Sequence, residues 1–405
     1  MRQKMIKNEF RPETLEYMNE VNVEYRKSLG QYFTPESIRE KLLSKLPKKE
    51  NPKILDPGCG TGEFLLTAKE YFENPELYGW DIDEKLVRIS QKLVPDAQIE
   101  KTDALKRNDY EKYDFVIGNP PYYEFCLDTE LREKLGEVIN GRANIYSLFV
   151  YQGIKLLKSG GYLAYVVSPS MNNGAYFANL RSFIVKNCNI EYLSVLDSPN
   201  LFYEALQSVM LLILKKGQNK GDYIFKKNGI LIFSEEVDYL DKAFEGRTTL
   251  FELGYKVMTG KLVWNDNKHL LTHEAEGNIP LIWSYNVTPE GLKLGNHDRP
   301  QYVKIRAGYD VGPAIVVNRI VGRPGSGTIR AALIPSGTKF IGENHVNVIF
   351  PPKQARFLPI GEKAELNDIL KQLNSPEKVR VVQSITGNTQ ISKNELEKLF
   401  PIDSK

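Results

Sequence analysis

The sequence predicts an α/β protein whose first part is a doubly wound, mostly parallel, Rossmann-like sheet and whose second part is a separate β-containing domain. In the first half of the chain, apolar runs typical of buried strands alternate with segments whose apolar residues recur at helical spacing. This alternation favours a parallel sheet with helices on both faces. A chain of 405 residues is too long for one ordinary hydrophobic core, so two domains are expected.

The expected elements of the first part follow one another in the order typical of a doubly wound fold. Strands are expected at residues 52–60, 76–83, 97–105, 113–122, 162–170, 190–198 and 208–217. Helices are expected at residues 62–72, 83–94, 144–161 and 178–187. The third of these helices closes on two glycines, the residue type that most often ends a helix.

The pattern changes after about residue 220. Strand-like pieces separated by Gly, Pro and Asn lie at residues 222–227, 230–234, 314–322 and 346–350. Helical periodicity returns at residues 363–375 and 393–401. We therefore expect a second domain that contains β-structure, with the boundary between residues 220 and 250.

Composition and cysteine usage indicate the compartment. The chain is 41% hydrophobic and 26% charged, with a mean hydropathy of −0.37. No apolar run reaches membrane-spanning length and the first residues have no signal-peptide core, so we expect a cytoplasmic protein. The cysteines Cys59, Cys126 and Cys188 lie far apart, which argues against a disulfide framework and a zinc site. We expect no bound metal.

Positive charge is concentrated in the C-terminal part. From Gly246 to Lys405 the chain carries 21 Lys and Arg against 15 Asp and Glu, whereas the first 245 residues carry 33 against 36. Between Lys293 and Arg356 the count is 10 against 3. This density indicates a polyanionic partner, although a solvated basic face is the alternative. The candidate contact residues are Arg299, Lys304, Arg306, Arg319, Arg323 and Arg330.

A glycine-rich turn follows the first expected strand. The segment "ILDPGCGTGEF" places Gly58, Gly60 and Gly62 between a strand and a helix. Glycines there let backbone N–H groups approach a ligand closely. The GxGxG spacing differs from the dinucleotide fingerprint, so a pyrophosphate is not the favoured ligand. The carboxylate of Asp56, beside this turn, suits a ligand ammonium group.

Two further acids end the next two expected strands. A carboxylate at the position of Asp81 is suited to accept hydrogen bonds from ribose hydroxyls, and Asp103 is suited to accept from an exocyclic adenine amine. Taken singly, each is as well explained as a turn or N-cap residue. Their joint order, after the glycine turn, describes a ligand with an amino-acid group, a ribose and an adenine. That ligand is S-adenosylmethionine.

The fourth expected strand ends in "GNPPYY". Neither Pro120 nor Pro121 can donate a backbone hydrogen bond, and both fix φ near −65°, so together they stop a strand abruptly. The segment is either a rigid strand exit or a rigid platform that presents Asn119 and Tyr122 to a ligand. These six residues alone leave both interpretations open.

Taken together, the motifs resemble those of S-adenosylmethionine-dependent DNA adenine-N6 methyltransferases of the gamma arrangement. The resemblance rests on "GQYFTP" (30–35), "DPGCGTGEF" (56–64), "WDID" around Asp81, "TDA" around Asp103, "NPPY" (119–122) and, more weakly, residues 201–216. In this arrangement the cofactor motifs come first, "NPPY" follows, and a target-recognition domain closes the chain. The resemblance therefore implies a catalytic domain at residues 1–240 and a DNA target-recognition domain at residues 241–405.

The resemblance also implies a reaction and partners. One adenine of a short double-stranded DNA sequence is flipped out of the helix and methylated at N6. Such enzymes are usually one half of a restriction–modification pair, so a separate cognate restriction endonuclease is a candidate partner. Methyltransferases that act on RNA or on a protein glutamine are the nearest alternative. A catalytically silent DNA-binding module is a more distant one.

An exocyclic adenine amine is a poor nucleophile because its lone pair is delocalised into the ring. Hydrogen-bond acceptors on its N–H groups favour a more tetrahedral nitrogen. The side-chain carbonyl of Asn119 and the backbone carbonyl of Pro120 are the expected acceptors, and Pro121 holds the loop. Tyr122 is expected to stack on one face of the base. The second stacking residue is Phe202 or, because the motif around it is one residue short, Tyr203.

In "GQYFTP", Tyr32, Phe33 and Thr34 are expected to close over the methionine end of the cofactor. A helix start is the other interpretation, with Thr34 as N-cap and Pro35 as the first helical residue. Both interpretations are compatible.

Overall fold

The structure is a computed structural model. It describes residues 9–139, 141, 143–196, 208–288, 290–295, 297–318, 329–352, 361–386 and 391–403. The chain divides into two compact units, one formed by 1–224 with 231–235 and the other by 225–230 with 236–405. Within the described residues, no helix combines the length and the apolar character that crossing a bilayer requires.

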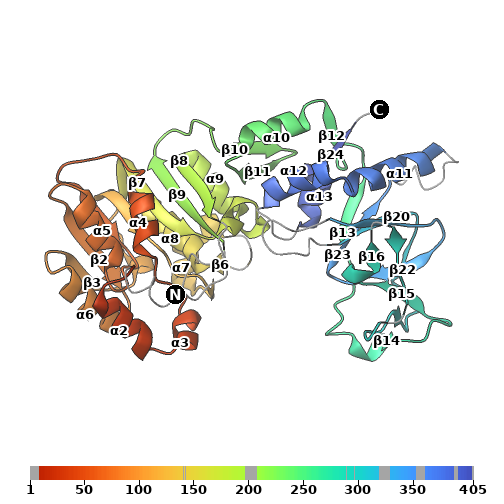
Figure 1. The fold of residues 1–405 in the computed structure, drawn as a ribbon, viewed down its shortest axis with the longest axis horizontal. Helices are drawn as coiled ribbons and strands as arrows, with labels where there is room; N and C mark the ends of the chain where they lie inside the picture. Colours follow the sequence, from red (N-terminus) through yellow and green to blue (C-terminus); the bar gives the residue numbers. More distant parts are fainter. Residues whose placement is uncertain are drawn as a thin grey trace. The chain divides into compact units, whose positions relative to one another are not determined.

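A seven-stranded sheet in the order β3-β2-β1-β4-β7-β9-β8 forms the centre of the first unit (Figure 1). Its strands are β1 (Lys53–Asp56), β2 (Glu76–Asp81), β3 (Gln98–Lys101), β4 (Tyr113–Gly118), β7 (Leu157–Val167), β8 (Cys188–Leu196) and β9 (Val209–Lys216). Neighbours from β3 to β7 pair in parallel, and β9 runs antiparallel to both β7 and β8. The predicted doubly wound, mostly parallel sheet is therefore confirmed.

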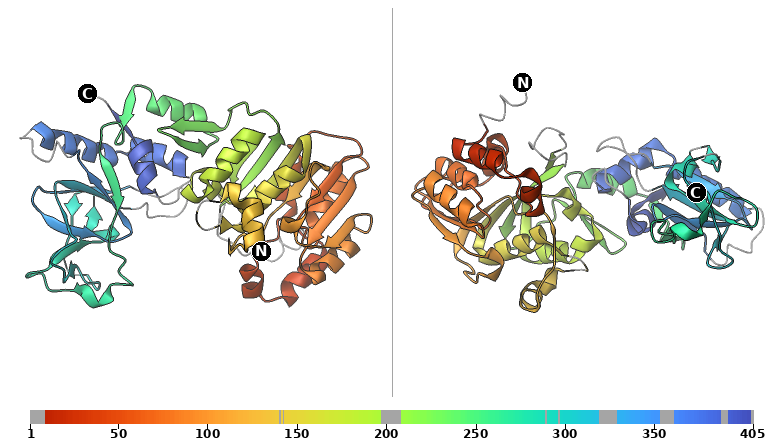
Figure 2. Two further views of the ribbon diagram at one scale, coloured as in Figure 1. Left: turned by 180° about the vertical axis from the view of Figure 1, so that it is seen from behind. Right: turned by 90° about the horizontal axis from the view of Figure 1, so that it is seen from below.

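Helices cover both faces of this sheet (Figure 2). The helices of the first unit are α2 (Pro12–Glu20), α3 (Val23–Ser28), α4 (Glu36–Leu43), α5 (Glu63–Tyr71), α6 (Glu84–Leu93), α7 (Thr129–Leu135), α8 (Ile145–Leu156) and α9 (Ala178–Asn187), of which α4, α5, α6, α8 and α9 pack on the strands. Side chains of β4 alternate between two cores, with Phe115 and Ile117 in the core beneath α4 and α5, and Val116 in the core beneath α8 and α9. This alternation is what a strand buried on both faces requires.

Two expected elements give way to an element of another kind before their expected end. The helix expected at 144–161 stops at Leu156, and residues 157–161 belong to β7, which pairs Leu157 with Tyr113 and Tyr162 with Phe115. The strand expected at 97–105 stops at Lys101, and Ala104–Lys106 form the 3-10 helix η1. In the first case, pairing with β4 outweighs the glycine stop signal. In the second, a side-chain cap starts a new turn.

The first unit also contains the short strands β5 (Glu124–Phe125) and β6 (Ala143–Asn144) and the 3-10 helices η2 (Gly136–Val138), η3 (Pro169–Asn172) and η4 (Ala175–Phe177). The hairpin of β10 (Ile224–Lys227) and β11 (Ile230–Phe233) lies where the chain passes between units. Helix α10 (Val237–Phe244), which the sequence did not predict, begins the longer part of the second unit.

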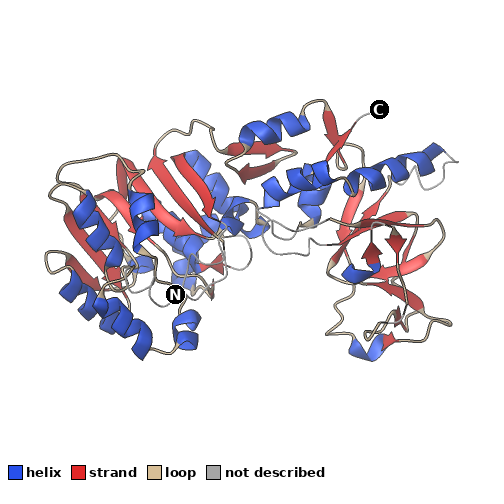
Figure 3. Ribbon diagram, viewed as in Figure 1, coloured by secondary structure: helices blue, strands red, loops and turns tan. Residues whose placement is uncertain are grey.

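The second unit is built around an antiparallel sheet in the order β13-β23-β20-β21 (Figure 3). These strands are β13 (Lys256–Thr259), β20 (Ala314–Asn318), β21 (Ala331–Ile334) and β23 (Val346–Phe350). One face packs on the helices α11 (Gly361–Leu373), α12 (Pro376–Thr386) and α13 (Lys393–Leu399). The predicted β-containing second part is thus present, although α12 was not predicted.

A second sheet of this unit has the order β14-β18-β15-β22-β19. Its strands are β14 (Leu271–Thr272), β15 (Ile279–Ile282), β18 (Tyr302–Val303), β19 (Asp310–Val311) and β22 (Lys339–Gly342). Two small sheets complete the unit: β12 (Arg247–Thr249) with β24 (Pro401–Asp403), and β16 (Val287–Thr288) with β17 (Gly291–Leu292). Its 3-10 helices are η5 (Lys268–Leu270) and η6 (Ser284–Asn286).

Candidate active site

A pocket of about 400 Å³ lies where the parallel strands of the first unit end. Strands β1, β2 and β4 end at Asp56, Asp81 and Gly118, so their last residues meet at one edge of the sheet. The predicted residues that line this pocket are Tyr32, Phe33, Thr34, Asp56, Gly58, Gly60, Asp81, Asp103, Asn119 and Pro121. The structure therefore brings together motifs that are up to 89 residues apart in the chain.

The glycine turn between β1 and α5 points its backbone N–H groups at the neighbouring acids. Gly58 N donates to Asp56 Oδ1 at 3.1 Å, and Gly60 N donates to Asp81 Oδ2 at 3.0 Å. Gly62, the N-cap of α5, has φ +92°, and a Cβ there would lie 2.6 Å from Ser90 Oγ. Only glycine fits this close packing of the turn on α6.

Burial leaves two carboxyl groups with raised pKa values. Asp56 is 2% exposed, and its burial raises the pKa of its carboxyl to about 8. Burial likewise raises the pKa of Asp81 to about 6. No described residue forms an ion pair with Asp56, so burial favours its neutral form unless a cationic group is supplied.

Asp103 combines the two interpretations that its position allows. Its carboxylate accepts from Leu105 N at 3.0 Å, and it is the N-cap of η1. The half-buried residue also lines the pocket. Its role toward an adenine amine stays a prediction.

Asn119 is held by the segment that carries Tyr32 and Thr34. Asn119 Nδ2 donates to Tyr32 O at 2.9 Å and to Thr34 Oγ1 at 3.1 Å. The hydroxyl of Thr34 is therefore used here and caps no helix. The expected N-cap role of Thr34 is wrong, because α4 begins at Glu36 with Pro35 as its N-cap.

Tyr122 turns its hydroxyl toward the same amide. Tyr122 Oη lies 2.7 Å from Asn119 Oδ1 and 2.7 Å from Val166 O. Its ring packs against Tyr32 and Tyr146, with centroids 6.0 and 5.7 Å away. Burial, followed by the nearby Tyr146 and Tyr32, raises the pKa of the Tyr122 phenol well above its usual range, so it stays a neutral donor. Stacking of Tyr122 on a base stays a prediction, and Phe202 and Tyr203 lie outside the described residues.

The sequence reasoning missed several residues of this site. Phe149 and Ile145 on α8 line the pocket, and so do Tyr123 and Phe125 behind "NPPY". Helix α8 is buried on nearly every side, so its apolar sequence predicts core residues at every position. A motif search alone therefore could not have separated Phe149 from its neighbours. The polar residues missed include Arg39 and Glu63.

The predicted DNA contacts of the second unit are only partly described. Arg319 and Arg323 lie outside the described residues. Arg299, Lys304 and Arg306 are exposed, whereas the half-buried Arg330 pairs its backbone N–H with Asn318 Oδ1 at 2.6 Å.

Arg299 belongs to an aromatic cluster of the second unit that consists of Trp264, Trp283, Tyr285 and His297. Its guanidinium lies 5.4 Å from the ring centre of Trp264 and 5.2 Å from that of Trp283. The ring of His297 stacks on Tyr285 at 4.0 Å. A cation held over aromatic rings at an exposed position is available to a polyanion.

Among the described residues, no group of three or more His, Cys, Asp or Glu side chains is placed to hold a metal ion. The absence of a metal from the protein stays a prediction.

Comparison with known proteins identifies the family. The model of the N-6 DNA Methylase family matches residues 13–252, more than half of the chain. The chain belongs to the N-6 DNA Methylase family. The match covers every residue of the pocket described above.

Three known methyltransferases are similar to this protein over most of the chain. The modification methylase CviBIII of Paramecium bursaria Chlorella virus NC1A is 24% identical over 302 residues, which are 72% of this chain and 74% of that protein. The type II methyltransferase M.CvrRI of Paramecium bursaria Chlorella virus XZ-6E is 25% identical, over 76% and 80% of the two chains. The type II methyltransferase M.BsuBI of Bacillus subtilis is 24% identical, over 93% and 88%. The similarity to M.BsuBI therefore extends into the second unit.

Proposed function

We propose that this protein is a site-specific DNA methyltransferase that transfers the methyl group of S-adenosylmethionine to N6 of a flipped-out adenine, as the modification partner of a restriction system. The observation that carries the proposal is the carboxamide of Asn119, which lines the same pocket as the acids Asp56 and Asp81. Membership of the N-6 DNA Methylase family and similarity to type II modification methylases support the substrate and the system.

The pocket residues fit S-adenosylmethionine by their chemistry. The buried carboxyl of Asp56 pairs with the ligand's ammonium, and Asp81 accepts hydrogen bonds from its ribose hydroxyls. Asp103 accepts from the exocyclic amine of the cofactor's adenine. Tyr32, Phe33 and Thr34 cover the methionine end. The bound cofactor supplies an electrophilic methyl group.

The chain itself orients the target amine. Asn119 Oδ1 and the carbonyl of Pro120 accept from its two N–H groups, which directs the nitrogen lone pair toward the methyl group. Pro121 keeps these two acceptors at a fixed spacing. Tyr122 and Phe202 stack on the extruded base, each contact contributing about 1–3 kcal/mol.

We assign catalysis and DNA recognition to different parts of the chain. We place the catalytic domain at residues 1–240 and the DNA target-recognition domain at residues 241–405, with Arg299, Lys304, Arg306, Arg319, Arg323 and Arg330 as DNA contacts. The basic balance of the second part and the exposed Arg299, Lys304 and Arg306 support this assignment. A cognate restriction endonuclease is the proposed partner.

Transfer of tritiated methyl from S-adenosylmethionine to genomic DNA from an unmethylated host tests the proposal. We expect label in DNA, and single-molecule sequencing should find N6-methyladenine in one short sequence. Total RNA and a mixture of cellular proteins serve as competing acceptors in parallel reactions. Label confined to RNA or to protein glutamine would contradict the proposal.

A further inference from the structure

Both hydrogens of the Asn119 carboxamide are bound by a segment that lies more than 80 residues earlier in the chain. Nδ2 donates to Tyr32 O at 2.9 Å and to Thr34 Oγ1 at 3.1 Å. A backbone carbonyl can only accept, so the amide atom that faces Tyr32 must be the nitrogen. This contact decides which way the amide points, a choice that atom positions alone often leave open.

The orientation so fixed directs Asn119 Oδ1 away from Tyr32 and Thr34. The oxygen lies 2.7 Å from the hydroxyl of Tyr122, whose single proton it shares with Val166 O, also 2.7 Å away. An amide oxygen has two lone pairs, so one remains for an incoming N–H group. If the amide turned over, its oxygen would face the Tyr32 carbonyl, which can only accept.

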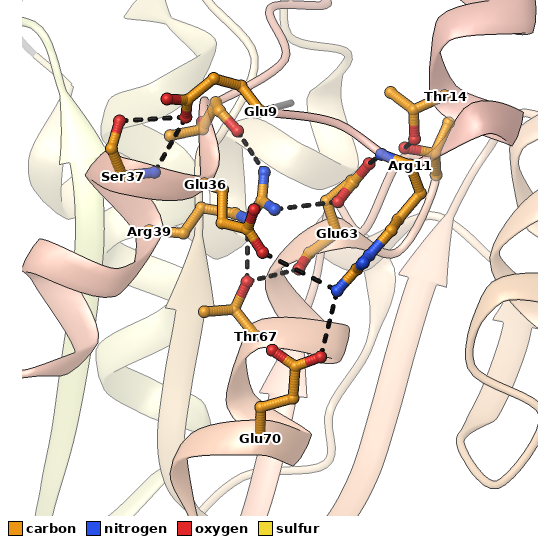
Figure 4. A network of polar contacts seen from close by, with 11 residues as sticks. Glu9, Arg11, Thr14, Glu36, Ser37, Arg39, Glu63, Thr67 and Glu70 are labelled. Atoms are coloured by element: carbon orange, nitrogen blue, oxygen red, sulfur yellow. Dashed lines mark hydrogen bonds and ion pairs between the residues drawn. The ribbon is translucent and has the colours of Figure 1, made fainter. Parts of the chain in front are cut away.

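The backbone carbonyl of Thr34 is bound by the buried Arg39, whose contacts with Glu63 and Thr67 are drawn in Figure 4. The guanidinium of Arg39 is 1% exposed and donates through Nη1 to Thr34 O at 2.5 Å, through Nη2 to Glu63 Oε2 at 2.9 Å and through Nε to Thr67 Oγ1 at 2.9 Å. Glu63 Oε1 in turn accepts from Arg11 N at 2.8 Å. The rigid fork of an arginine can serve these acceptors together.

We infer that Thr34 is a positioning residue for the methyl-transfer step, because its hydroxyl, together with the Tyr32 carbonyl, sets the direction of the Asn119 amide oxygen. This inference rests on the proposed function and deepens it. The segment proposed to cover the cofactor thereby also prepares the acceptor of the target amine. A substitution at Thr34 should then affect turnover through Asn119, beyond any contact with the cofactor.

The variants Thr34→Val and Thr34→Ser separate these roles. Valine keeps the shape of threonine and removes the acceptor, whereas serine keeps the acceptor. We expect Thr34→Val to lower kcat by about tenfold to a hundredfold with little change in the Kd for S-adenosylmethionine, and Thr34→Ser to retain most of kcat. A raised Kd with unchanged kcat would overturn the inference, because it would leave Thr34 a cofactor contact only.

A second readout does not depend on methyl transfer. In protein labelled with ¹⁵N-asparagine, the side-chain NH₂ signals of Asn119 are identified by their loss in Asn119→Asp. We expect hydrogen exchange of this NH₂ group to be slow in the wild type and in Thr34→Ser, and faster in Thr34→Val. Equal exchange in all three proteins would overturn the inference.

These readouts also separate failure of the inference from failure of the proposed function. A wild-type protein that transfers methyl to no DNA would refute the proposed function, while the exchange measurement still decides the role of Thr34. If Thr34→Val does not fold, Thr34→Ala removes the same acceptor without a branched side chain and enters the same comparison. Thr272 is a buried threonine of the second unit, and Thr272→Val controls for the loss of a buried hydroxyl elsewhere.

Discussion

Gly30 lies directly against the backbone of Tyr122. A Cβ on Gly30 would come within 2.5 Å of Tyr122 N, 2.9 Å of Tyr123 Cδ1 and 3.2 Å of Pro121 Cβ. Gly30 also has φ +65°, a left-handed conformation that side chains disfavour. The segments "GQYFTP" and "NPPY" thus meet backbone to backbone at the edge of the candidate active site.

Replacing Gly30 with alanine should separate these two segments. We expect Gly30→Ala to lose most methyl transfer and to unfold at lower denaturant concentration than the wild type. Gly277→Ala is the matched control, because Gly277 has φ +71° with no atom within 4 Å of an added Cβ. The control carries only the left-handed penalty of about 1–2 kcal/mol. Equal losses in the two variants would show that close packing at Gly30 does not matter.

Substitution of Asn119 tests the proposed acceptor. Asn119→Ala removes the side-chain carbonyl and keeps β4 and the two prolines that follow Asn119. We expect methyl transfer to fall below detection and binding of duplex DNA to stay within a few-fold of the wild type. Filter binding and the tritium assay measure the two quantities on the same preparation. Normal turnover in this variant would rule out the mechanism.

The pKa of Asp56 predicts how cofactor affinity depends on pH. With a pKa of about 8, this carboxyl is mostly protonated at neutral pH in the cofactor-free protein, and pairing with an ammonium group requires loss of the proton. Affinity for S-adenosylmethionine should therefore rise with pH up to about pH 8, by at most about tenfold per pH unit. Isothermal titration calorimetry in buffers of different ionisation enthalpy should also detect the released proton.

Stability of the cofactor-free protein should change in the opposite direction. Because the folded-state pKa of Asp56 is raised, the native state binds more protons than the unfolded state between about pH 4 and about pH 8. The contribution of Asp56 to the free energy of unfolding is thus favourable at low pH and is lost as pH rises through that window. Asp56→Asn should flatten both profiles. A variant whose affinity for the cofactor still rises with pH would point to another group.

Arg299 should contribute to DNA binding in a salt-dependent way. Its guanidinium is exposed above Trp264 and Trp283, and the described residues include no carboxylate paired with it. We expect Arg299→Ala to weaken duplex binding and to reduce the slope of log K against log salt by about one. Lys186→Ala, which removes an exposed charge from the first unit, should leave the slope unchanged. An unchanged slope in Arg299→Ala would remove this residue from the interface.

The buried pair of Arg39 and Glu63 should be strongly coupled. Arg39→Lys keeps a positive charge but cannot reach Thr34 O, Glu63 and Thr67 together. We expect a loss of about 1–3 kcal/mol in the free energy of unfolding, measured by urea denaturation. The double variant with Glu63→Gln should lose less than the sum of the single losses. Additive losses would show that the two side chains act independently.

The sequence predicted the parts of the fold that repeat a local pattern. Strand β4 is a continuous apolar run, and α9 has its buried apolar residues at helical spacing. Because such runs mark where strands end, the positions of Asp56 and Asp81 at strand ends could be predicted as well. "NPPY" could be singled out because its two prolines cannot donate backbone hydrogen bonds and therefore end a strand. These features depend mainly on residues close in sequence, which one chain displays directly.

Features that depend on distant contacts were not predictable. In "SIREKLL", Arg39 has the appearance of an exposed helix residue, and only the packing of α4 on α5 shows that it is buried. From the sequence, Thr34 is expected to cap a helix. In the structure its hydroxyl instead accepts a hydrogen bond from the side chain of Asn119. Residues 158–161 show a helix stop, yet pairing with β4 draws this stretch into β7.

The contact of Asn119 with Tyr32 and Thr34 limits how this enzyme can be recombined with its relatives. In a chimera that takes one of these two segments from a relative and keeps the other, the amide of one protein would have to fit the acceptors of the other protein. Residues 30–34 and 119–122 should therefore be transplanted together, as a single module, even though 84 residues separate them in the chain.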